Sequence, residues 1–181
     1  MQLLYALESI RMPWLDSIMS LITNCGGEMV FMALAIIVFW CFNKACGCYM
    51  LTVGFSGTVL NQFLKLAFRI PRPWVKDPNF TIVESARAAA TGYSFPSGHT
   101  ANVSAALGCS ARAVKSRAVR VVFLVIIAIV SFSRMYLGVH YPADVGFSLV
   151  VSAVLVFAAY PLFANSDERP ARVYLAVAVL T

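Results

Sequence analysis

Charged residues are scarce in this chain of 181 residues, and their scarcity excludes most soluble folds. Asp, Glu, Lys and Arg together make up 12% of the residues, hydrophobic residues make up 60%, and the mean hydropathy is +0.79. Soluble domains carry about a quarter charged residues, because polar side chains must cover their surface. The composition therefore predicts an integral membrane protein.

Residues that form disulfides or bind metals are also few. The sequence has 2 histidines and 5 cysteines, and an odd number of cysteines does not suit a disulfide framework. We interpret the cysteines as reduced, small apolar residues, because they lie in or beside apolar segments: Cys25, Cys41, Cys46, Cys48 and Cys109. Cys41, Cys46 and Cys48 lie close together, but no histidine or fourth cysteine completes a zinc site with them. The sequence therefore predicts no metal site and no cofactor.

The net charge of +6 does not indicate nucleic acid binding. The 14 Lys and Arg residues form short clusters between apolar runs rather than one basic face, and no RNA- or DNA-binding motif is present. We expect these charges to set the membrane topology and to bind an anionic substrate.

The N-terminal segment differs from the rest of the chain. Residues 2–22 have helical periodicity with a polar side, so we assign residues 1–24 to a helix that lies in the membrane interface. A cleaved signal peptide is not indicated, because the start lacks a basic region and no small-residue cleavage site follows. Gly26 and Gly27 are expected to end this helix.

Apolar runs predict the membrane-spanning helices, each near the ~20 residues that a bilayer core requires. The predicted spans are residues 29–42, 45–66, 98–114, 121–138 and 142–164. A sixth apolar run begins at Val173 and is cut off at Thr181, so we expect a truncated sixth helix. Residues 67–96 form a polar loop with several prolines that cannot be helical throughout. The predicted fold is all-α, a polytopic transmembrane bundle with a six-helix core formed by a single domain over residues 1–181.

Basic residues in the loops bear on the orientation of this bundle. Alternating spans put seven on one side: Lys44, Arg112, Lys115, Arg117, Arg120, Arg169 and Arg172. The other side also has seven: Arg11, Lys65, Arg69, Arg72, Lys76, Arg87 and Arg134. If some residues of the second set serve chemistry, the first side is cytoplasmic and loop 67–96 is extracytoplasmic. We expect the membrane to be a bacterial cytoplasmic membrane.

Unusual polar residues gather on the side of loop 67–96. An ionisable side chain near the hydrocarbon costs a few kcal/mol unless it is paired or functional. Four clusters fall at this face: Lys65 with Arg72, Pro96-Ser97-Gly98-His99, Ser133-Arg134, and His140 with Asp144. Their convergence indicates a polar site at the membrane surface.

The residue types in these clusters suit a phosphate group. Three side chains can neutralise phosphoryl oxygens, the arginines with two donors at once: Lys65, Arg72 and Arg134. Ser97 can supply a hydroxyl, and glycine lets the backbone approach closely at Gly98. The N–H groups of Gly98 and His99 at a helix N-terminus favour an anion.

Two histidines and one carboxylate are the candidate catalytic residues. His140 and Asp144 are spaced i, i+4, so the carboxylate can fix the imidazole tautomer and stabilise its charge if the helix begins by Pro142. His140 is then the candidate nucleophile. His99, from another helix, is the candidate acid that protonates the leaving oxygen.

Three motifs between residues 65 and 144 resemble, in order and spacing, the signature of the type 2 phosphatidic acid phosphatase (PAP2) superfamily, which includes vanadium haloperoxidases. The motifs are Lys65-(six residues)-Arg72-Pro73, Pro96-Ser97-Gly98-His99 and Ser133-Arg134-(five residues)-His140-(three residues)-Asp144. The resemblance implies a six-helix membrane core, an active site at the outer face, no metal, and a phosphohistidine at His140. The incomplete sixth helix and the interfacial first helix depart from this pattern.

Each motif alone also has a plainer interpretation. Pro-Ser commonly caps a helix, His with Asp at i, i+4 is often a surface pair, and interfacial cations often anchor a helix. The joint arrangement favours a phosphatase for a lipid phosphate or diphosphate, such as phosphatidic acid, phosphatidylglycerol phosphate or polyprenyl diphosphate. Two alternatives stay open: vanadate-dependent halide oxidation in the same pocket, and a non-catalytic protein that binds or transports a lipid phosphate.

Overall fold

The computed structural model describes residues 1–164, and every regular element among them is helical. The elements are α1 (Gln2–Ser9), α2 (Pro13–Asn24), α3 (Glu28–Ile37), η1 (Val38–Phe42), α4 (Lys44–Phe68), α5 (Pro73–Lys76), η2 (Glu84–Ala86), α6 (Gly98–Ala113), α7 (Arg117–Tyr136) and α8 (Pro142–Phe163). The all-α prediction is confirmed. The sixth helix expected from Val173 lies outside the described residues.

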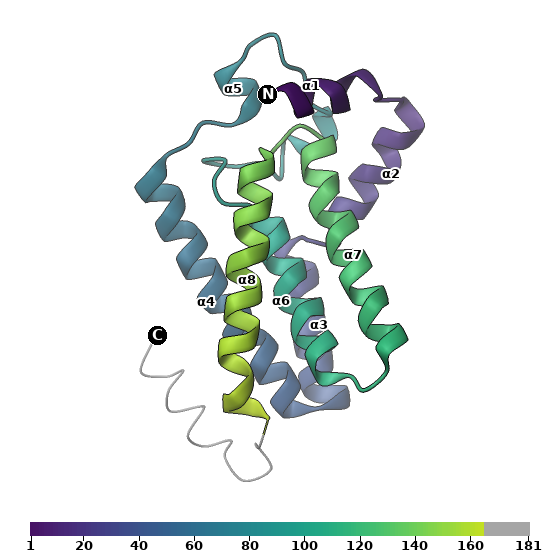
Figure 1. The fold of residues 1–181 in the computed structure, drawn as a ribbon, viewed down its shortest axis with the longest axis vertical. Helices are drawn as coiled ribbons and strands as arrows, with labels where there is room; N and C mark the ends of the chain where they lie inside the picture. The colour runs from purple at the N-terminus through teal and green to yellow at the C-terminus, as the bar shows by residue number, and fades with distance from the viewer. Residues whose placement is uncertain (165–181) are drawn as a thin grey trace.

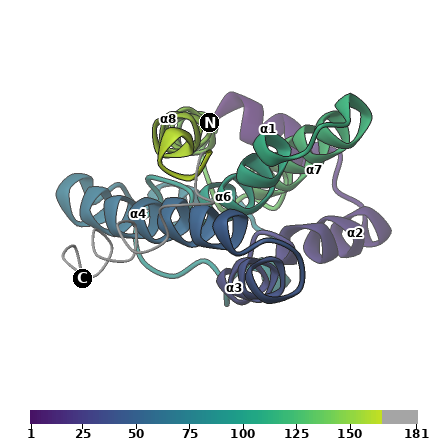
Figure 2. The same ribbon diagram turned by 90° about the horizontal axis from the view of Figure 1, so that it is seen from below.

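Helix α6 lies in the middle of the bundle. It contacts α3, α4, α7 and α8, and the view along the long axis in Figure 2 shows these helices around it. Its sequence, GHTANVSAALGCSARA, is rich in small residues, which let neighbouring helices in a membrane protein approach closely. Because other helices surround it, α6 needs only 16 residues and little apolar surface of its own.

The five predicted spans correspond to α3 with η1, α4, α6, α7 and α8. By length and composition α7 and α8 are apolar enough to cross a membrane, and α2 with α3 and η1 passes as a pair bent by 48°. The largest boundary error is at α7, which begins at Arg117 rather than at residue 121. Ser116 causes the earlier start, because its side chain accepts a hydrogen bond from the Val119 N–H and caps the helix.

The N-terminal segment forms two helices, so the single helix predicted over residues 2–22 is wrong. Helix α1 ends at Ser9, and α2 begins at Pro13 after Met12 in an extended conformation (φ −140°, ψ 144°). Proline favours the first helical position and moves the preceding residue out of the helical region. The predicted break at Gly26-Gly27 is confirmed, because α2 ends at Asn24 and α3 begins at Glu28. Figure 1 shows α2 beside α7, against which it packs.

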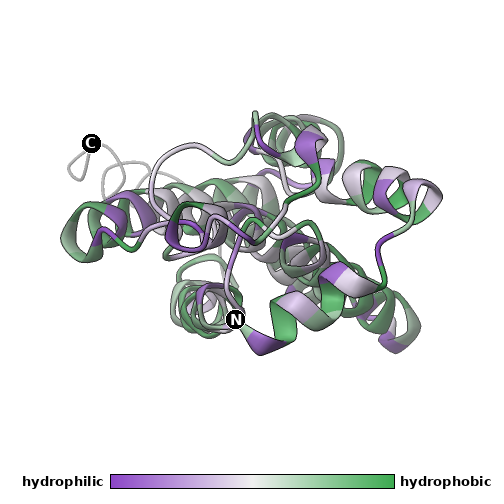
Figure 3. Cartoon of the chain, turned by 90° about the horizontal axis from the view of Figure 1, so that it is seen from above, coloured by the Kyte–Doolittle hydropathy of each residue, from purple (hydrophilic) through white to green (hydrophobic). Residues whose placement is uncertain are grey.

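The largest apolar core and the main group of buried polar residues lie toward opposite ends of the bundle. The apolar core between α3, α4, α6 and α8 includes Phe31, Tyr49, Met50, Cys109 and Phe163. Buried polar side chains lie toward the other end: Arg72, Ser94, Ser97, Thr100, Ser133, Arg134, His140 and Asp144. Figure 3 is seen from that end and shows hydrophilic segments of the loops among largely hydrophobic helices. The fold therefore places a buried polar cluster at one end of a membrane bundle.

Candidate active site

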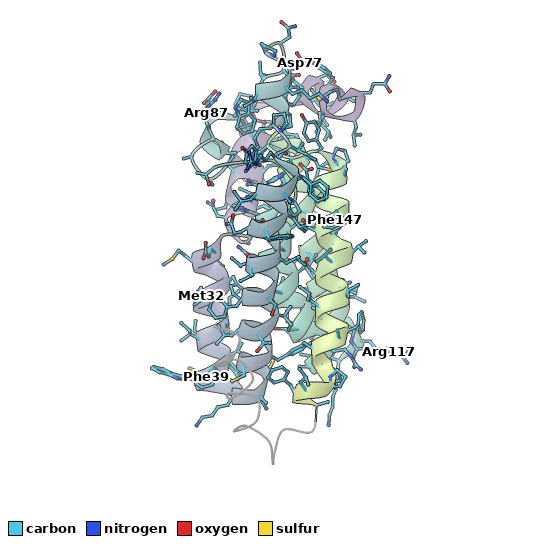
Figure 4. The ribbon with its side chains drawn as sticks, turned by 90° about the vertical axis from the view of Figure 1, so that its left-hand side faces the viewer. Met32, Phe39, Asp77, Arg87, Arg117 and Phe147 are labelled. Carbon is cyan, nitrogen blue, oxygen red and sulfur yellow. The ribbon has the colours of Figure 1, made fainter. Side chains whose placement is uncertain are left out.

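The polar cluster lies at the end of the bundle that carries the loop between α4 and α6. Figure 4 shows this end, with Asp77 and Arg87 of the loop, opposite the end that carries Arg117. Charge interactions and hydrogen bonds connect residues of α4, the loop, α6, α7 and the α7–α8 connection. The predicted residues meet here: Lys65, Arg72, Ser97, Gly98, His99, Arg134, His140 and Asp144.

Asp144, His140 and Arg72 form one hydrogen-bonded row. Arg72 Nη1 lies 3.1 Å from His140 Nε2, and His140 Nδ1 lies 3.4 Å from Asp144 Oδ2. A guanidinium has only donors, so we assign the lone pair of the neutral ring to Nε2 and its proton to Nδ1, facing the carboxylate. In this tautomer Nε2 is the atom that can attack an electrophile.

His140 is held in its neutral form. It lies in the connection between α7 and α8 and is 2% exposed. Burial lowers the pKa of His140 well below its usual 6.5, and the positive charges of Arg72, Arg134 and Lys65 lower it further. The imidazole therefore keeps its lone pair at neutral pH, as a nucleophile requires.

Asp144 is fixed by more than the histidine. Its Oδ2 atom also accepts hydrogen bonds from Ser94 Oγ at 2.5 Å and from the Tyr141 N–H at 2.9 Å. Tyr141 is the N-cap residue of α8 and Pro142 begins the helix, so in this bond the Asp144 side chain, in the first turn, accepts from the N-cap N–H. The start of α8 therefore sets the position of the carboxylate.

Ser94 and Ser148 are site residues that the sequence reasoning missed. Ser94 is fully buried, and its hydroxyl donates to Asp144. Ser148 Oγ donates to the Asp144 carbonyl and accepts from the Ser97 N–H, both at 2.8 Å, so it joins α8 to the start of α6. The only available signals were the proximity of Ser94 to the Pro-Ser-Gly-His run and the i+4 spacing of Ser148 from Asp144.

Arg72 is bound mainly to the backbone. It is 4% exposed, and it donates to the carbonyls of Val139 at 2.8 Å, Thr91 at 2.8 Å and Gly92 at 3.2 Å. Burial lowers the pKa of Arg72 to about 10, against the opposing effect of Asp144, so the guanidinium stays charged at neutral pH. It joins the loop to the His140 segment and adds positive charge, rather than presenting the free bidentate fork expected from the sequence.

Arg134, in contrast, presents two free donors side by side. The side chain is fully buried, and Nη1 donates to Thr23 Oγ1 at 2.7 Å. Its Nε and Nη2 atoms are buried and have no hydrogen-bond partner among the described residues. These two donors lie on the same edge of the guanidinium, where they can bind two oxygens of one phosphate.

The start of α6 offers backbone donors. Ser97 is fully buried, and its Oγ accepts from Thr100 N at 3.4 Å and Thr100 Oγ1 at 3.0 Å, so it caps the helix. No described residue accepts from the N–H groups of Gly98 and His99, the first two of the helix. A side chain at Gly98 would meet no atom within 4 Å, so the backbone there is open to an anion.

The charge balance of the site suits a phosphate dianion. Lys65, half-buried in the last turn of α4, joins Arg72 and Arg134 as the third cation, and Asp144 is the one carboxylate among the predicted residues. Three positive charges and one negative charge give the site a net charge of +2, which matches a phosphate dianion in magnitude. Within residues 1–164, no group of three or more His, Cys, Asp and Glu side chains could hold a metal ion.

Comparison with known proteins identifies the family. A sequence model of the PAP2 superfamily matches residues 45–168. Undecaprenyl-diphosphatase BcrC of Bacillus subtilis (strain 168) is 34% identical over 148 residues, covering 79% of this chain and 72% of that protein. Phosphatidylglycerophosphatase B of the same organism is 31% identical over 157 residues, covering 77% of this chain and 72% of that protein.

Solved structures share the fold. The crystal structure of a transmembrane PAP2-type phosphatidylglycerolphosphate phosphatase from Bacillus subtilis has a TM-score of 0.75 at 26% identity, over 91% of this chain and 84% of that chain. Aquifex aeolicus LpxE has a TM-score of 0.77 at 22% identity, over 88% of this chain and 93% of that chain. The fold, the site and the relatives define an integral membrane lipid phosphatase. The chain belongs to the PAP2 superfamily.

Proposed function

We propose that this protein hydrolyses a lipid phosphate or diphosphate through a covalent phosphohistidine formed at Nε2 of His140. The observation that carries the proposal is a buried, neutral imidazole whose Nε2 lone pair faces a cluster of three cations. Such a cluster attracts a phosphoryl group and holds a nucleophile in reach of its phosphorus. Catalysis by positioning and charge neutralisation suits phosphoryl transfer, in which charge spreads over three equatorial oxygens.

The phosphate is proposed to bind between the cations and the start of α6. The Nε and Nη2 donors of Arg134 would bind two oxygens, and the N–H groups of Gly98 and His99 would bind a third. Lys65 would add a mobile point charge. The lipid tail would extend into the bilayer beside the bundle, whose outer surface carries exposed large apolar side chains such as Leu66 and Val150.

The reaction has two steps. In the first, His140 Nε2 forms a bond to phosphorus while the bond from phosphorus to the lipid oxygen breaks, and His99 gives its proton to that oxygen. The contact between Nε2 and Arg72 Nη1 must open to let the phosphorus approach. In the second step, water attacks phosphorus, the P–N bond breaks, and the proton of the water returns to His99. Inorganic phosphate leaves, and both histidines are restored.

Asp144 and the substrate are proposed to set the proton positions. The ring of His140 becomes positively charged when Nε2 is phosphorylated, because Nδ1 keeps its proton, and the Asp144 carboxylate stabilises that charge. A bound phosphate dianion would offset the repulsion that three nearby cations exert on a protonated His99. The acid would therefore be charged when the anionic substrate is present.

The substrate is proposed to be a lipid with a terminal phosphoryl group. Of the relatives, one is named as an undecaprenyl-diphosphatase and one as a phosphatidylglycerophosphatase. We therefore propose polyprenyl diphosphate, phosphatidylglycerol phosphate and phosphatidic acid as the candidates. Phosphate release from each lipid by the purified protein, with His140→Ala as the blank, would identify the substrate. No release from any of the three would refute the proposed activity.

The active site is proposed to face the outside of a bacterial cytoplasmic membrane. The burial of Arg72 and Arg134 supports leaving them out of the topology count together with Lys65. The loop side then keeps four basic residues, Arg11, Arg69, Lys76 and Arg87, against the seven of the other side.

A single cysteine at Asn79 tests this orientation, in a protein whose 5 native cysteines have been replaced. Asn79 is exposed in the loop, so it should react with an impermeant maleimide in intact cells. Reaction only after the cells are broken would reverse the orientation.

The roles of the two histidines are tested by changing the leaving group. A lipid alkoxide needs a proton to leave, whereas p-nitrophenolate leaves without one. His99→Ala should therefore slow hydrolysis of the lipid phosphate far more than hydrolysis of p-nitrophenyl phosphate, and His140→Ala should abolish both. The ratio of the two activities cancels differences in expression and detergent. An equal loss on both substrates in His99→Ala, or residual ester hydrolysis in His140→Ala, would contradict the assignments.

A further inference from the structure

We infer that residues 23–26, the end of α2 and the turn that follows it, are a positioning element of the active site, in which Thr23 orients Arg134 and Gly26 lets the turn lie against His99. The inference rests on the proposed function. This turn lies outside the signature motifs and outside residues 45–168, which match the superfamily.

Thr23 makes the only hydrogen bond that the Arg134 guanidinium has among the described residues. Thr23 is 3% exposed, and its Oγ1 accepts from Arg134 Nη1 at 2.7 Å. The other two nitrogens, Nε and Nη2, are buried and unpartnered. Because Nη1 lies outside the edge formed by Nε and Nη2, this bond orients the guanidinium plane and leaves both donors of that edge for a phosphate.

Helix α2 is itself held against α7 at its start. Tyr136 Oη, at the last residue of α7, donates to Asp16 Oδ1 in the first turn of α2 at 2.7 Å. Arg11, just before α2, donates from Nε to the Tyr136 carbonyl at 3.0 Å. Thr23 therefore meets Arg134 from a helix that packs along α7 and is hydrogen-bonded to the last residue of α7 at its start.

Gly26 brings the same turn against the candidate acid. A β-carbon at Gly26 would lie 2.8 Å from the His99 carbonyl oxygen and 3.0 Å from the His99 β-carbon. Asn102 Nδ2 also donates to the Gly26 carbonyl at 3.3 Å, which joins the turn to α6. Val130 Cγ1 of α7 would lie 3.0 Å away as well, so any side chain at position 26 must displace the turn, the start of α6 or the Val130 side chain.

The Thr23 part is tested with Thr23→Val, which has nearly the same shape and no hydroxyl. We expect a fall in kcat/KM of about 10- to 100-fold on the lipid phosphate, since a small misplacement of a binding group costs that much. Inhibition by orthovanadate, which binds where the phosphate binds, should weaken in parallel. Thr23→Ser should restore both. Thr58→Val is the matched control and should behave as the unchanged protein, because Thr58 lies on α4 two helical turns before Lys65.

A double mutant separates positioning from a general effect on the fold. In an Arg134→Lys background there is no fork to orient, so Thr23→Val should cause no further loss of kcat/KM or of vanadate inhibition. An additional loss in that background would overturn the inference. So would full activity in Thr23→Val, or a loss that is matched by a lower unfolding temperature. If Arg134→Lys loses activity while Thr23→Val does not, only the role of Thr23 fails and the proposed function stands.

The Gly26 part has its own readout. Gly26→Ala should reduce hydrolysis of the lipid phosphate more than hydrolysis of p-nitrophenyl phosphate, because it moves the acid and not the nucleophile. Gly57→Ala is the control, since its β-carbon would meet only Leu155 Cδ1 at an ordinary 3.8 Å. An equal effect of Gly26→Ala on both substrates would show that the turn does not position His99.

Discussion

Replacing Asp144 with asparagine should slow formation of the proposed phosphohistidine by about three orders of magnitude without disturbing the fold. Asparagine keeps the shape of the side chain, and its amide oxygen can accept the bonds that Ser94 Oγ and Tyr141 N now donate. The amide oxygen therefore still faces Nδ1 of His140, and Arg72 still donates to Nε2, so the tautomer is kept. What is lost is the negative charge.

The distance gives the size of this loss. A full positive charge on the ring at the 3.4 Å separation of Nδ1 and Oδ2 interacts with a carboxylate by about 5 kcal/mol at an effective dielectric constant near 20. The amide dipole retains a small part of this, so we expect a net loss of about 4 kcal/mol in the transition state. That loss corresponds to roughly 10³-fold in rate.

The assay is the rate of phosphohistidine formation after rapid mixing with radiolabelled substrate, with the unfolding temperature measured in the same detergent. Ser94→Ala is the matched control, because it removes a neutral hydrogen bond from the same oxygen and should cost only about 3- to 10-fold. If Asp144→Asn and Ser94→Ala slow the reaction by the same factor, the charge of Asp144 does not stabilise the histidine, and the reasoning fails.

Three further predictions concern pH, metal and the backbone near His140. Because burial lowers the pKa of His140 well below 6.5, kcat/KM should fall only as the pH drops through that lowered value. After correction for substrate ionisation, a loss of activity centred at pH 6.5 or above would contradict the neutral imidazole. Activity should survive EDTA and be inhibited by vanadate, because the three cations supply the charge that a metal would otherwise provide; recovery of a chelated sample by a divalent ion would argue for another mechanism. Gly138 has φ +80°, and a β-carbon there would lie 2.7 Å from Arg11 Nη2. Gly138→Ala should therefore lower the free energy of unfolding by at least about 1–2 kcal/mol and lower activity. Gly146→Ala should change neither, because a β-carbon at Gly146 would meet no atom within 4 Å.

The helices of the bundle could be predicted because their causes are local. Apolar runs of bilayer length, interrupted by Gly26-Gly27 and by the prolines of the loop, define where each helix lies. The two boundaries that differ from the hydropathy pattern also have local causes. Pro13 divides the N-terminal segment, and Ser116 starts α7 earlier than its apolar run. Both are single-residue effects that a hydropathy pattern does not contain.

The candidate site was predictable to the extent that it consists of short-range motifs. His140 and Asp144 are four residues apart on one helix start, so their contact follows from helix geometry. The alternation of spans was enough to place Lys65, Arg134 and the start of α6 at the same end of the bundle. The role of Arg72 was not predictable in the same way. Its side chain donates to loop carbonyls, and these contacts depend on how the loop folds back, whereas the cap formed by Ser97 is local to the start of α6.

The sequence by itself determined the membrane class, the order of the helices and the set of ionisable residues at one end, because hydropathy and helical spacing are local properties. Only the tertiary structure decided which donors are occupied and which are free. Thr23 meets Arg134 across 111 positions of the chain, and Ser94 meets Asp144 across 50. Serine and threonine are ordinary residues in such helices, and a single hydroxyl carries no pattern that reveals its partner. The packing of α2 against α7, and of the loop against α8, chooses that partner, and with it the edge of Arg134 that remains for a phosphate.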